Sequence, residues 1–372
     1  MPSASASVVR AATVLTASGP LSPGEVVVDG GVIVEVRPAT GPVSHDVMAP
    51  GFVDLQMNGI GAVDVAHAAD DDWEVLDAAL LAQGVTTWCP TLVSAPLAET
   101  EASLDRIVRA AARRGEGRPS IAGAHLEGPF LAVAGAHRPA HLRPAVNDRW
   151  LGSLPPVAVV TLAPELPGAL AAIERLAADG VVVALGHSAC SIDVARQAAD
   201  AGARLVTHLG NGMGPFRPRE PGLLGAALAD DRLSVSLIAD LVHIHPAMVR
   251  IAFRAKGAAR TVLVTDAVAT GTAGVGGDRP PRLADGTLVG SVLAMDRAVA
   301  NTVTDAGIAL ADAVTAASTT PAALLGLDDR GLIAVGRRAD LVALDDDLGV
   351  ESVWIAGRQA WTRRHRERGG RQ

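Results

Sequence analysis

The middle of the chain alternates between short apolar runs and longer segments in which apolar residues recur every three or four positions. Such alternation is typical of βα units that build a parallel sheet. The apolar runs predict eight strands, at Gly51–Gln56, Val85–Leu92, Ile121–Leu126, Val157–Ala163, Val181–Gly186, Arg204–His208, Leu233–Ala239 and Thr261–Thr265. The periodic segments predict helices, at Trp73–Gln83, Ala98–Arg114, Leu166–Ala178, Ile192–Ala201 and Pro246–Lys256. This pattern predicts a (β/α)8 barrel of the TIM type.

Both ends of the chain have a different pattern, in which short runs of alternating apolar and polar residues are separated by turns. Residues 8–49 contain two such runs around Asp29-Gly30-Gly31, which is typical of a β-hairpin. Residues 339–344 and 351–361 show the same pattern, with a turn at Gly357. We expect residues 1–49 and 332–372 to form one small β-sandwich domain, and residues 50–331 to form the barrel.

The composition supports a large aliphatic core and excludes some chemistry. Of the 372 residues, 49% are hydrophobic but only 2% are aromatic, and tyrosine is absent. A catalytic tyrosine is therefore excluded. Lys256, the single lysine, falls in a predicted helix rather than at a strand end. This position disfavours Schiff-base chemistry and a carbamylated-lysine metal bridge.

Charge and cysteine content limit the partners and the compartment. A net charge of -8 opposes nucleic-acid binding, which needs clustered cations. The one basic run, between Arg363 and Arg371, is interpreted as a solvated tail. Cys89 and Cys190 form no CxxC pair, which favours a reducing compartment. Because neither a signal-peptide pattern nor an apolar stretch of membrane-spanning length is found, we expect a cytoplasmic protein.

Polar residues recur where the predicted strands end. They are Gln56 and Asn58 after the first strand, His125 and Glu127 after the third, His187 and Ser188 after the fifth, His208 and Asn211 after the sixth, Asp240 and His243 after the seventh, and Asp266 after the eighth. Barrel enzymes assemble their active sites from the carboxyl ends of their strands. Any one of these residues could be structural, but their coincidence predicts a site.

One carboxylate and two imidazoles stand out within this set. Glu127, His187 and His208 would suit Zn2+ or Fe2+, and three protein ligands leave a position open, as in catalytic metal sites. Asp266 is placed to exchange protons with a water and a leaving amine. The alternative interpretation of Asp266 is a helix N-cap.

Ten motifs in order carry a resemblance over nearly the whole chain. They are APGFVDLQMNG (49–59), GVTTWCPTL (84–92), HLEGPFL (125–131), GAHRP (135–139), LGHS (185–188), THLGNGM (207–213), REPGLLGAAL (219–228), IADLVHI (238–244), LVTDA (263–267) and GSVLAM (290–295). In these motifs the sequence resembles the N-acetylglucosamine-6-phosphate deacetylase family of the amidohydrolase superfamily. The resemblance implies hydrolysis of the N-acetyl group of that sugar phosphate to glucosamine-6-phosphate and acetate.

The resemblance also implies a role for each matching residue. Glu127, His187 and His208 would bind one divalent ion, with Zn2+ preferred and Fe2+ or another first-row ion as the alternative. Asp266 would be the acid/base, and His137 would polarise the acetyl carbonyl. The residues implied on the substrate side are Gln56, Asn211, Gly212, Arg219 and His243. A homodimer is implied as well, in which Arg219 and His243 reach a neighbouring subunit's site.

The sequence departs from the wider superfamily at two places. Gln56-Met57-Asn58 stands where most members have His-x-His for a second ion, so we expect a single metal ion. The single-metal branch of the family shows the same Gln-x-Asn. Gly271–Asp285 is short and glycine-rich where the family has a longer flap, so a lid there would be small.

Three alternatives remain open at this stage. The substrate could be N-acetylgalactosamine-6-phosphate, which differs at one hydroxyl. The protein could be a metal-free sugar-phosphate-binding pseudoenzyme, as the missing His-x-His would suggest. It could also be an amidohydrolase for a different ring, although a phosphate grip at Arg219 and His243 disfavours that reading.

Overall fold

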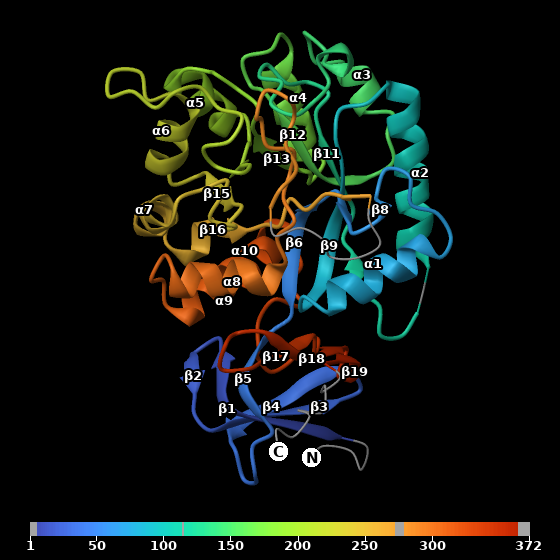
Figure 1. The fold of residues 1–372 in the computed structure, drawn as a ribbon, viewed down its shortest axis with the longest axis vertical. Coiled ribbons are helices and arrows are strands. Elements are labelled where there is room, and N and C mark those ends of the chain that lie inside the picture. Colours follow the sequence, from blue (N-terminus) through green and yellow to red (C-terminus); the bar gives the residue numbers. More distant parts are fainter. Residues whose placement is uncertain (1–5, 114, 272–278, 364–372) are drawn as a thin grey trace.

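The computed structural model describes residues 6–113, 115–271 and 279–363. Its larger sheet contains nine strands, all paired in parallel: β6 (Phe52–Met57), β9 (Val85–Leu92), β10 (Ser120–Ile121), β11 (Ala124–Glu127), β12 (Val157–Leu162), β13 (Val182–Leu185), β14 (Leu205–Val206), β15 (Ser234–Leu237) and β16 (Thr261–Leu263). The order is β10-β9-β11-β12-β13-β14-β15-β16, with β6 on β9. Figure 1 shows this barrel in the upper part of the molecule. The predicted (β/α)8 fold is confirmed.

All eight predicted strands are present, although one is divided. The run predicted as Ile121–Leu126 is split between β10 and β11, which flank Ala122 and Gly123. Gly123 has a φ of +138°, and a Cβ there would lie 2.8 Å from Cβ of Ala158. Only glycine fits this close approach between neighbouring strands.

Helices surround the barrel. They are α1 (Asp72–Leu81), α2 (Leu97–Ala112), α3 (Asp148–Leu151), α4 (Ala169–Ala178), α5 (Ile192–Asp200), α6 (Gly222–Ala229), α7 (Pro246–Lys256), α8 (Met295–Thr304), α9 (Leu310–Ala317) and α10 (Thr319–Leu324). The five predicted helices correspond to α1, α2, α4, α5 and α7. On α2 the buried residues Leu104, Ile107 and Ala110 recur every three residues, which is the spacing of one helix face. Helix α6 was not predicted because GLLGAALA contains no polar positions to mark a face.

A second sheet joins the two ends of the chain. Its order is β19-β18-β17-β5-β1-β3-β4, with β2 on β1. The strands are β1 (Ser7–Thr16), β2 (Gly19–Leu21), β3 (Gly24–Asp29), β4 (Val32–Pro38), β5 (His45–Pro50), β17 (Leu341–Leu344), β18 (Val350–Ile355) and β19 (Arg358–Thr362). In Figure 1 the blue and red strands lie together below the barrel, and β17 pairs antiparallel with β5.

This smaller sheet has its own core and closes back on itself. The N–H of Ile33 donates to the carbonyl of Arg337 at 2.8 Å, so the segment before β17 bonds to β4 at the far side of the sheet. Val14, Ile33 and Leu341 are among its fully buried residues. The hairpin predicted at Asp29-Gly30-Gly31 joins β3 and β4. The proposed domain limits, 1–49 with 332–372 and 50–331, remain a prediction.

The barrel closes between its first and last strands without a regular ladder. Within the described residues β6 pairs only with β9, and β16 pairs only with β15. The segments that follow β6 and β16 meet just beyond the strands. There the N–H of Asp266 donates to the carbonyl of Gln56, and the N–H of Asn58 donates to the carbonyl of Ala267, both at 2.8 Å. This seam brings the first and last of the polar strand ends together.

Two further observations bear on the expected setting of the protein. Among the described residues, no helix has the length and apolar character needed to cross a membrane. Cys89 and Cys190 are both buried free thiols. Most of the predicted basic tail, from residue 364 onward, lies outside the described residues, as do residues 272–278 of the glycine-rich stretch.

Candidate functional site

Three of the predicted site residues have an unusual backbone conformation. His187, His208 and Asp266 have φ values of +48°, +30° and +46°, in the left-handed region that side chains with a Cβ rarely adopt. Each follows a barrel strand, β13, β14 or β16. Such strain persists only where the surrounding structure enforces it, and it concentrates at functional sites. The backbone thus points to the same strand ends as the sequence motifs.

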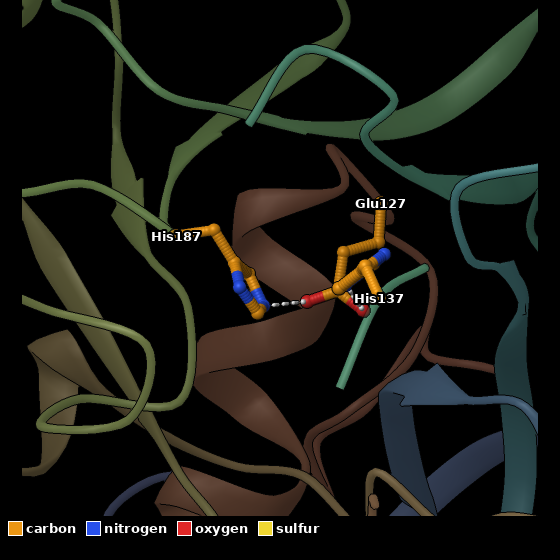
Figure 2. Close-up of side chains that lie close together, drawn as sticks. All are labelled: Glu127, His137 and His187. Atoms are coloured by element: carbon orange, nitrogen blue, oxygen red, sulfur yellow. Dashed lines mark ion pairs between the residues drawn. The ribbon is translucent and has the colours of Figure 1, made fainter. Parts of the chain in front are cut away.

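The carboxylate of Glu127 lies at the centre of a buried cluster of histidines. Its Oε1 lies 2.9 Å from Nε2 of His208 and 3.3 Å from Nε2 of His187. Its Oε2 lies 3.8 Å from Nε2 of His137. Figure 2 shows the imidazoles of His187 and His137 close to this carboxylate. Burial raises the pKa of Glu127, but the bonds from His187 and His208 outweigh burial and hold it well below its usual range.

The ring of His187 is oriented by its surroundings. Its Nδ1 donates to the carbonyl of Val133 at 3.0 Å, so Nε2, which faces Glu127, is the ring nitrogen that a metal ion would bind. A Cβ at Gly135 would lie 3.0 Å from Cε1 of this ring, and one at Gly212 would lie 2.9 Å from Nδ1. Both glycines also have positive φ, so no other residue fits there without strain. His187 is thereby prepared to act as a metal ligand.

His137 has the opposite hydrogen-bond pattern. The backbone N–H of Ser94 donates to Nδ1 of His137 at 3.2 Å, so in the neutral ring the proton resides on Nε2. Burial lowers the pKa of His137 to about 4, against the attraction of Glu127 for the charged form. At neutral pH the ring is therefore uncharged and directs an N–H donor toward the cluster. This arrangement suits a group that donates to a carbonyl oxygen.

The cluster fits a divalent metal ion. Single ligand atoms of Glu127, His137 and His187 all lie within 4.8 Å of one another, and all three residues are buried. His208 approaches the same carboxylate even more closely. One carboxylate with imidazoles is a ligand set typical of Zn2+ and related ions. Because Nδ1 of His137 accepts a hydrogen bond from Ser94, the neutral ring carries its proton on Nε2 and offers no lone pair to an ion there.

Asp266 lies beside the cluster and is held by two side-chain amides. Asn58 donates to Oδ1 of Asp266 at 2.8 Å, and Gln56 donates to the same oxygen at 3.2 Å. Burial and the charge of Glu127 raise the pKa of Asp266 to about 6. The residues that follow Asp266 are not helical, so the N-cap interpretation is wrong. A buried carboxylate of this kind suits proton transfer.

Gln56 lies between the two carboxylates. Its Nε2 donates to Oε1 of Glu127 and to Oδ1 of Asp266, each at 3.2 Å. Its Oε1 accepts a 2.7 Å hydrogen bond from the hydroxyl of Thr207. The amide therefore stands where the sequence departs from His-x-His, and it contacts the acidic groups directly.

The residues predicted to hold the phosphate are only partly brought together. Nδ2 of Asn211 donates to the carbonyl of His208, and Gly212 packs on His187, so both belong to the site. The ring of His243 is fixed by a 2.7 Å bond from Nδ1 to Asp240. Arg219 is exposed in the turn between Arg217 and Glu220, and the structure does not bring it to the cluster within one chain.

Sequence reasoning assigned no individual role to several residues that support the site. His125 was noted only as a strand-end residue, but it is a buried structural residue that bonds the carbonyl of Leu55 and the hydroxyl of Thr161. Ser188, at a strand end, donates to Glu165 at 2.6 Å and so anchors the turn after His187. Thr207, which bonds Gln56, was also not singled out. Its position directly before the ligand candidate His208 was the one signal in the sequence, and hydroxyl residues are too common at strand ends for that signal to be specific.

Comparisons with known proteins agree with this geometry. Residues 47–360 match the family described as "Amidohydrolase family". The chain is 40% identical over 349 residues to N-acetylglucosamine-6-phosphate deacetylase of Bos taurus, covering 85% of this chain and 83% of that protein. It is 38% identical to N-acetylgalactosamine-6-phosphate deacetylase of Escherichia coli O157:H7, covering 95% and 99%.

A solved structure gives the same result at the level of the fold. It is an N-acetyl-D-glucosamine-6-phosphate deacetylase variant from Mycobacterium smegmatis in complex with N-acetyl-D-glucosamine-6-phosphate. It superposes on this chain with a TM-score of 0.87 at 35% identity, and the match covers 96% of this chain and 100% of that one. The chain belongs to the amidohydrolase family. Within that family it is similar to the amino-sugar-phosphate deacetylases, as the ten sequence motifs predicted.

Proposed function

We propose that this protein hydrolyses the N-acetyl group of N-acetylglucosamine-6-phosphate to give glucosamine-6-phosphate and acetate. The observation that carries the proposal is the buried arrangement of complementary groups around Glu127. An N–H donor on His137 lies on one side, and the carboxylate of Asp266 lies close by. Amide hydrolysis needs both a donor for the developing oxyanion and a group that moves protons.

Glu127, His187 and His208 are the residues we propose to hold one divalent ion, with Zn2+ preferred and Fe2+ as an alternative. When bound, such an ion polarises a carbonyl and acidifies water. The bond from Nδ1 of His187 to Val133 leaves its Nε2 free for this purpose. The amides of Gln56 and Asn58 are poor metal ligands and already donate to Asp266, which supports a single ion.

Side chains of the protein would carry out the proton transfers and stabilise the developing oxyanion. Asp266, held by Asn58, would take a proton from the attacking water and return it to the departing amine. His137 would donate a hydrogen bond from its Nε2–H to the acetyl oxygen as negative charge develops there. Oδ1 of Asn58, which is buried and has no partner in the described part of the chain, offers an acceptor for that water.

The sugar phosphate would lie toward Asn211, Gly212 and His243, with Gln56 on the inner side. Arg219 is exposed in its own chain, which is compatible with delivery to a partner subunit in a homodimer. Guanidinium groups suit phosphate oxygens because they donate in a fixed fork. The homodimer and the cytoplasmic location remain predictions, as do the two domain limits.

N-acetylgalactosamine-6-phosphate is the second candidate substrate. The relative from Escherichia coli that bears this name matches 95% of the chain and 99% of its own length. A metal-free binding protein is less well supported, since the carboxylates and imidazoles of the cluster are all retained.

The deciding experiment is an acetate-release assay on both amino-sugar phosphates. It is run on the purified protein, after chelation, and after re-addition of Zn2+ or Fe2+ separately. We expect release from N-acetylglucosamine-6-phosphate to dominate, to stop on chelation and to return with one of the ions. No release from either sugar under any condition would reject the proposal, and preference for the galacto sugar would establish the second candidate.

A further inference from the structure

Asp54 is a fully buried carboxylate below the site for which the proposed mechanism has no use. It lies on β6, two residues before Gln56, and its side chain accepts three hydrogen bonds. The backbone N–H groups of Gln56 and Thr265 donate to its Oδ1 at 3.1 and 3.3 Å. The hydroxyl of Thr265 donates to its Oδ2 at 2.6 Å.

These bonds lie at the seam where the barrel has no ladder. In a regular parallel pair the N–H of Thr265 would find a carbonyl on the neighbouring strand. Here it finds the Asp54 side chain, and the next residue, Asp266, donates its own N–H to the carbonyl of Gln56 at 2.8 Å. Asp54 thus joins the two strand ends that carry Gln56 and Asp266.

The neighbouring backbone shows why this connection matters. Asp266 has a φ of +46°, a conformation that costs free energy and needs support from its surroundings. Its own side chain is held by Asn58 and Gln56, which both belong to the β6 side of the seam. If the seam opened, the Asp266 carboxylate and its two amide partners would move apart.

We propose that Asp54 is a positioning residue that holds the Thr265–Asp266 segment against the end of β6 and so sets the orientation of the Asp266 carboxylate. This inference rests on the acid/base role proposed above for Asp266. Among the described residues, the hydrogen bonds of the Asp54 side chain go to Gln56 and Thr265 and not to the proposed metal ligands. Its effect passes through two backbone N–H groups and one hydroxyl.

Asp54→Asn is a conservative control for Asp54→Ala, because the Asp54 carboxyl is buried and its pKa is raised. Burial raises the pKa of Asp54 to about 7, while the hydroxyl and the two N–H groups oppose that shift. We therefore expect a neutral side chain of the same shape to be tolerated at this position. In Asp54→Asn the amide oxygen can still accept both N–H groups, and the Thr265 hydroxyl can reverse to accept from the new amide. Asp54→Ala removes all three bonds.

The test compares three variants of the intact chain. Asp54→Ala and Asp54→Asn are measured beside Val262→Ala, which removes a buried side chain from β16 without touching the carboxylate. We expect kcat to fall about 30-fold or more in Asp54→Ala with KM within about threefold, since small misplacements cost such factors. Asp54→Asn should retain kcat within about fivefold. Val262→Ala should have a lower melting temperature than the wild type and an unchanged kcat.

Amide hydrogen exchange supplies a readout that needs no substrate. In Asp54→Ala, residues 261–268 should exchange faster than in the wild type, whereas Asp54→Asn should match the wild type. The proposal is overturned if Asp54→Ala keeps normal kcat, if Asp54→Asn is as slow as Asp54→Ala, or if exchange in 261–268 is unchanged. A wild-type protein that releases no acetate would reject the proposed function, and the exchange result would still decide the role of Asp54.

Discussion

The hydroxyl of Thr207 donates a 2.7 Å hydrogen bond to Oε1 of Gln56, and both side chains are buried. This bond fixes which end of the Gln56 amide faces the site. The nitrogen must then face Glu127 and Asp266, which lie 3.2 Å from it. Gln56 thereby places its two N–H bonds between two carboxylates that would otherwise repel each other.

Thr207→Val should lower kcat/KM by about 10- to 100-fold. Valine has nearly the same shape but leaves Oε1 of Gln56 buried without a donor, which costs about 1–3 kcal/mol. Steady-state kinetics on N-acetylglucosamine-6-phosphate measure the effect. Thr207→Ser is the matched control, because it keeps the hydroxyl and should remain near the wild type. Equal rates in the two variants would show that the bond to Gln56 has no role.

The sequence identified Gln56 but could not supply this arrangement. Gln-x-Asn in place of His-x-His predicted one metal ion, because amides are poor ligands. The partners of an amide depend on side chains from other strands, here Thr207 after β14 and Asp266 after β16. The relative positions of these strand ends depend on the register of the folded sheet, which cannot be predicted from the spacing of residues along the sequence.

Asp266→Asn should bind the sugar phosphate with nearly normal KM but lose kcat by several powers of ten. One residue is proposed to act as both base and acid, so both proton transfers fail together. The side-chain amide of the variant also changes the local hydrogen bonds, because its NH2 group, unlike the carboxylate oxygen that it replaces, cannot accept from Asn58 and Gln56. Single-turnover acetate release measures the loss. A variant with more than about a tenth of normal kcat would exclude the role.

Activity should fall on the acid side of neutrality. Burial and the nearby Glu127 raise the pKa of Asp266 to about 6. Asp266 accepts a proton only when it is ionised, so kcat should decline as pH falls through about 6. An ordinary carboxyl would titrate near 3.8 and leave kcat level down to about pH 5. The pH profile of kcat, measured at saturating metal and substrate, separates the two cases.

Two of the three histidines beside Glu127 should behave differently when removed. His208→Ala should lose bound metal, with affinity lowered by more than the ~10- to 100-fold typical of outer-sphere partners. His137→Ala should keep about one ion per chain and lose turnover, because Nδ1 of His137 already accepts from Ser94. Metal analysis after dialysis measures both. Metal loss in His137→Ala with retention in His208→Ala would assign the third ligand to His137.

The positions of the strands were largely predictable, and the strain at their ends was not. Val85–Leu92 has the predicted bounds, since its apolar residues are buried on both faces of the sheet. The left-handed conformations at His187 and His208 accompany contacts with residues remote in the chain, of His187 with Val133 and Gly212 and of His208 with Ser236. Hydrophobic periodicity reports which side of an element is buried and carries no information on such contacts.

Glu25 links three strands of the smaller sheet and should make its stability depend on acid. Nε of Arg37 donates to its Oε1 at 2.6 Å, and Nε of Arg10 donates to its Oε2 at 2.7 Å. Burial raises the pKa of Glu25, but these bonds outweigh it and lower the pKa from 4.5 to about 2. Because the folded pKa lies below the unfolded one, the stabilisation is complete above pH 4.5 and is lost as pH falls toward 2.

Glu25→Gln should therefore lower the free energy of unfolding by about 2 kcal/mol at pH 7, the scale of hydrogen bonds to a charged group. The difference between the variant and the wild type should shrink as pH falls below 4.5. Urea unfolding at several pH values measures both effects. Glu35→Gln is the matched control, because Glu35 also pairs with Arg37 but is 41% exposed, and exposed pairs contribute less than about 1 kcal/mol. An equal loss in the two variants would show that the buried position of Glu25 adds nothing.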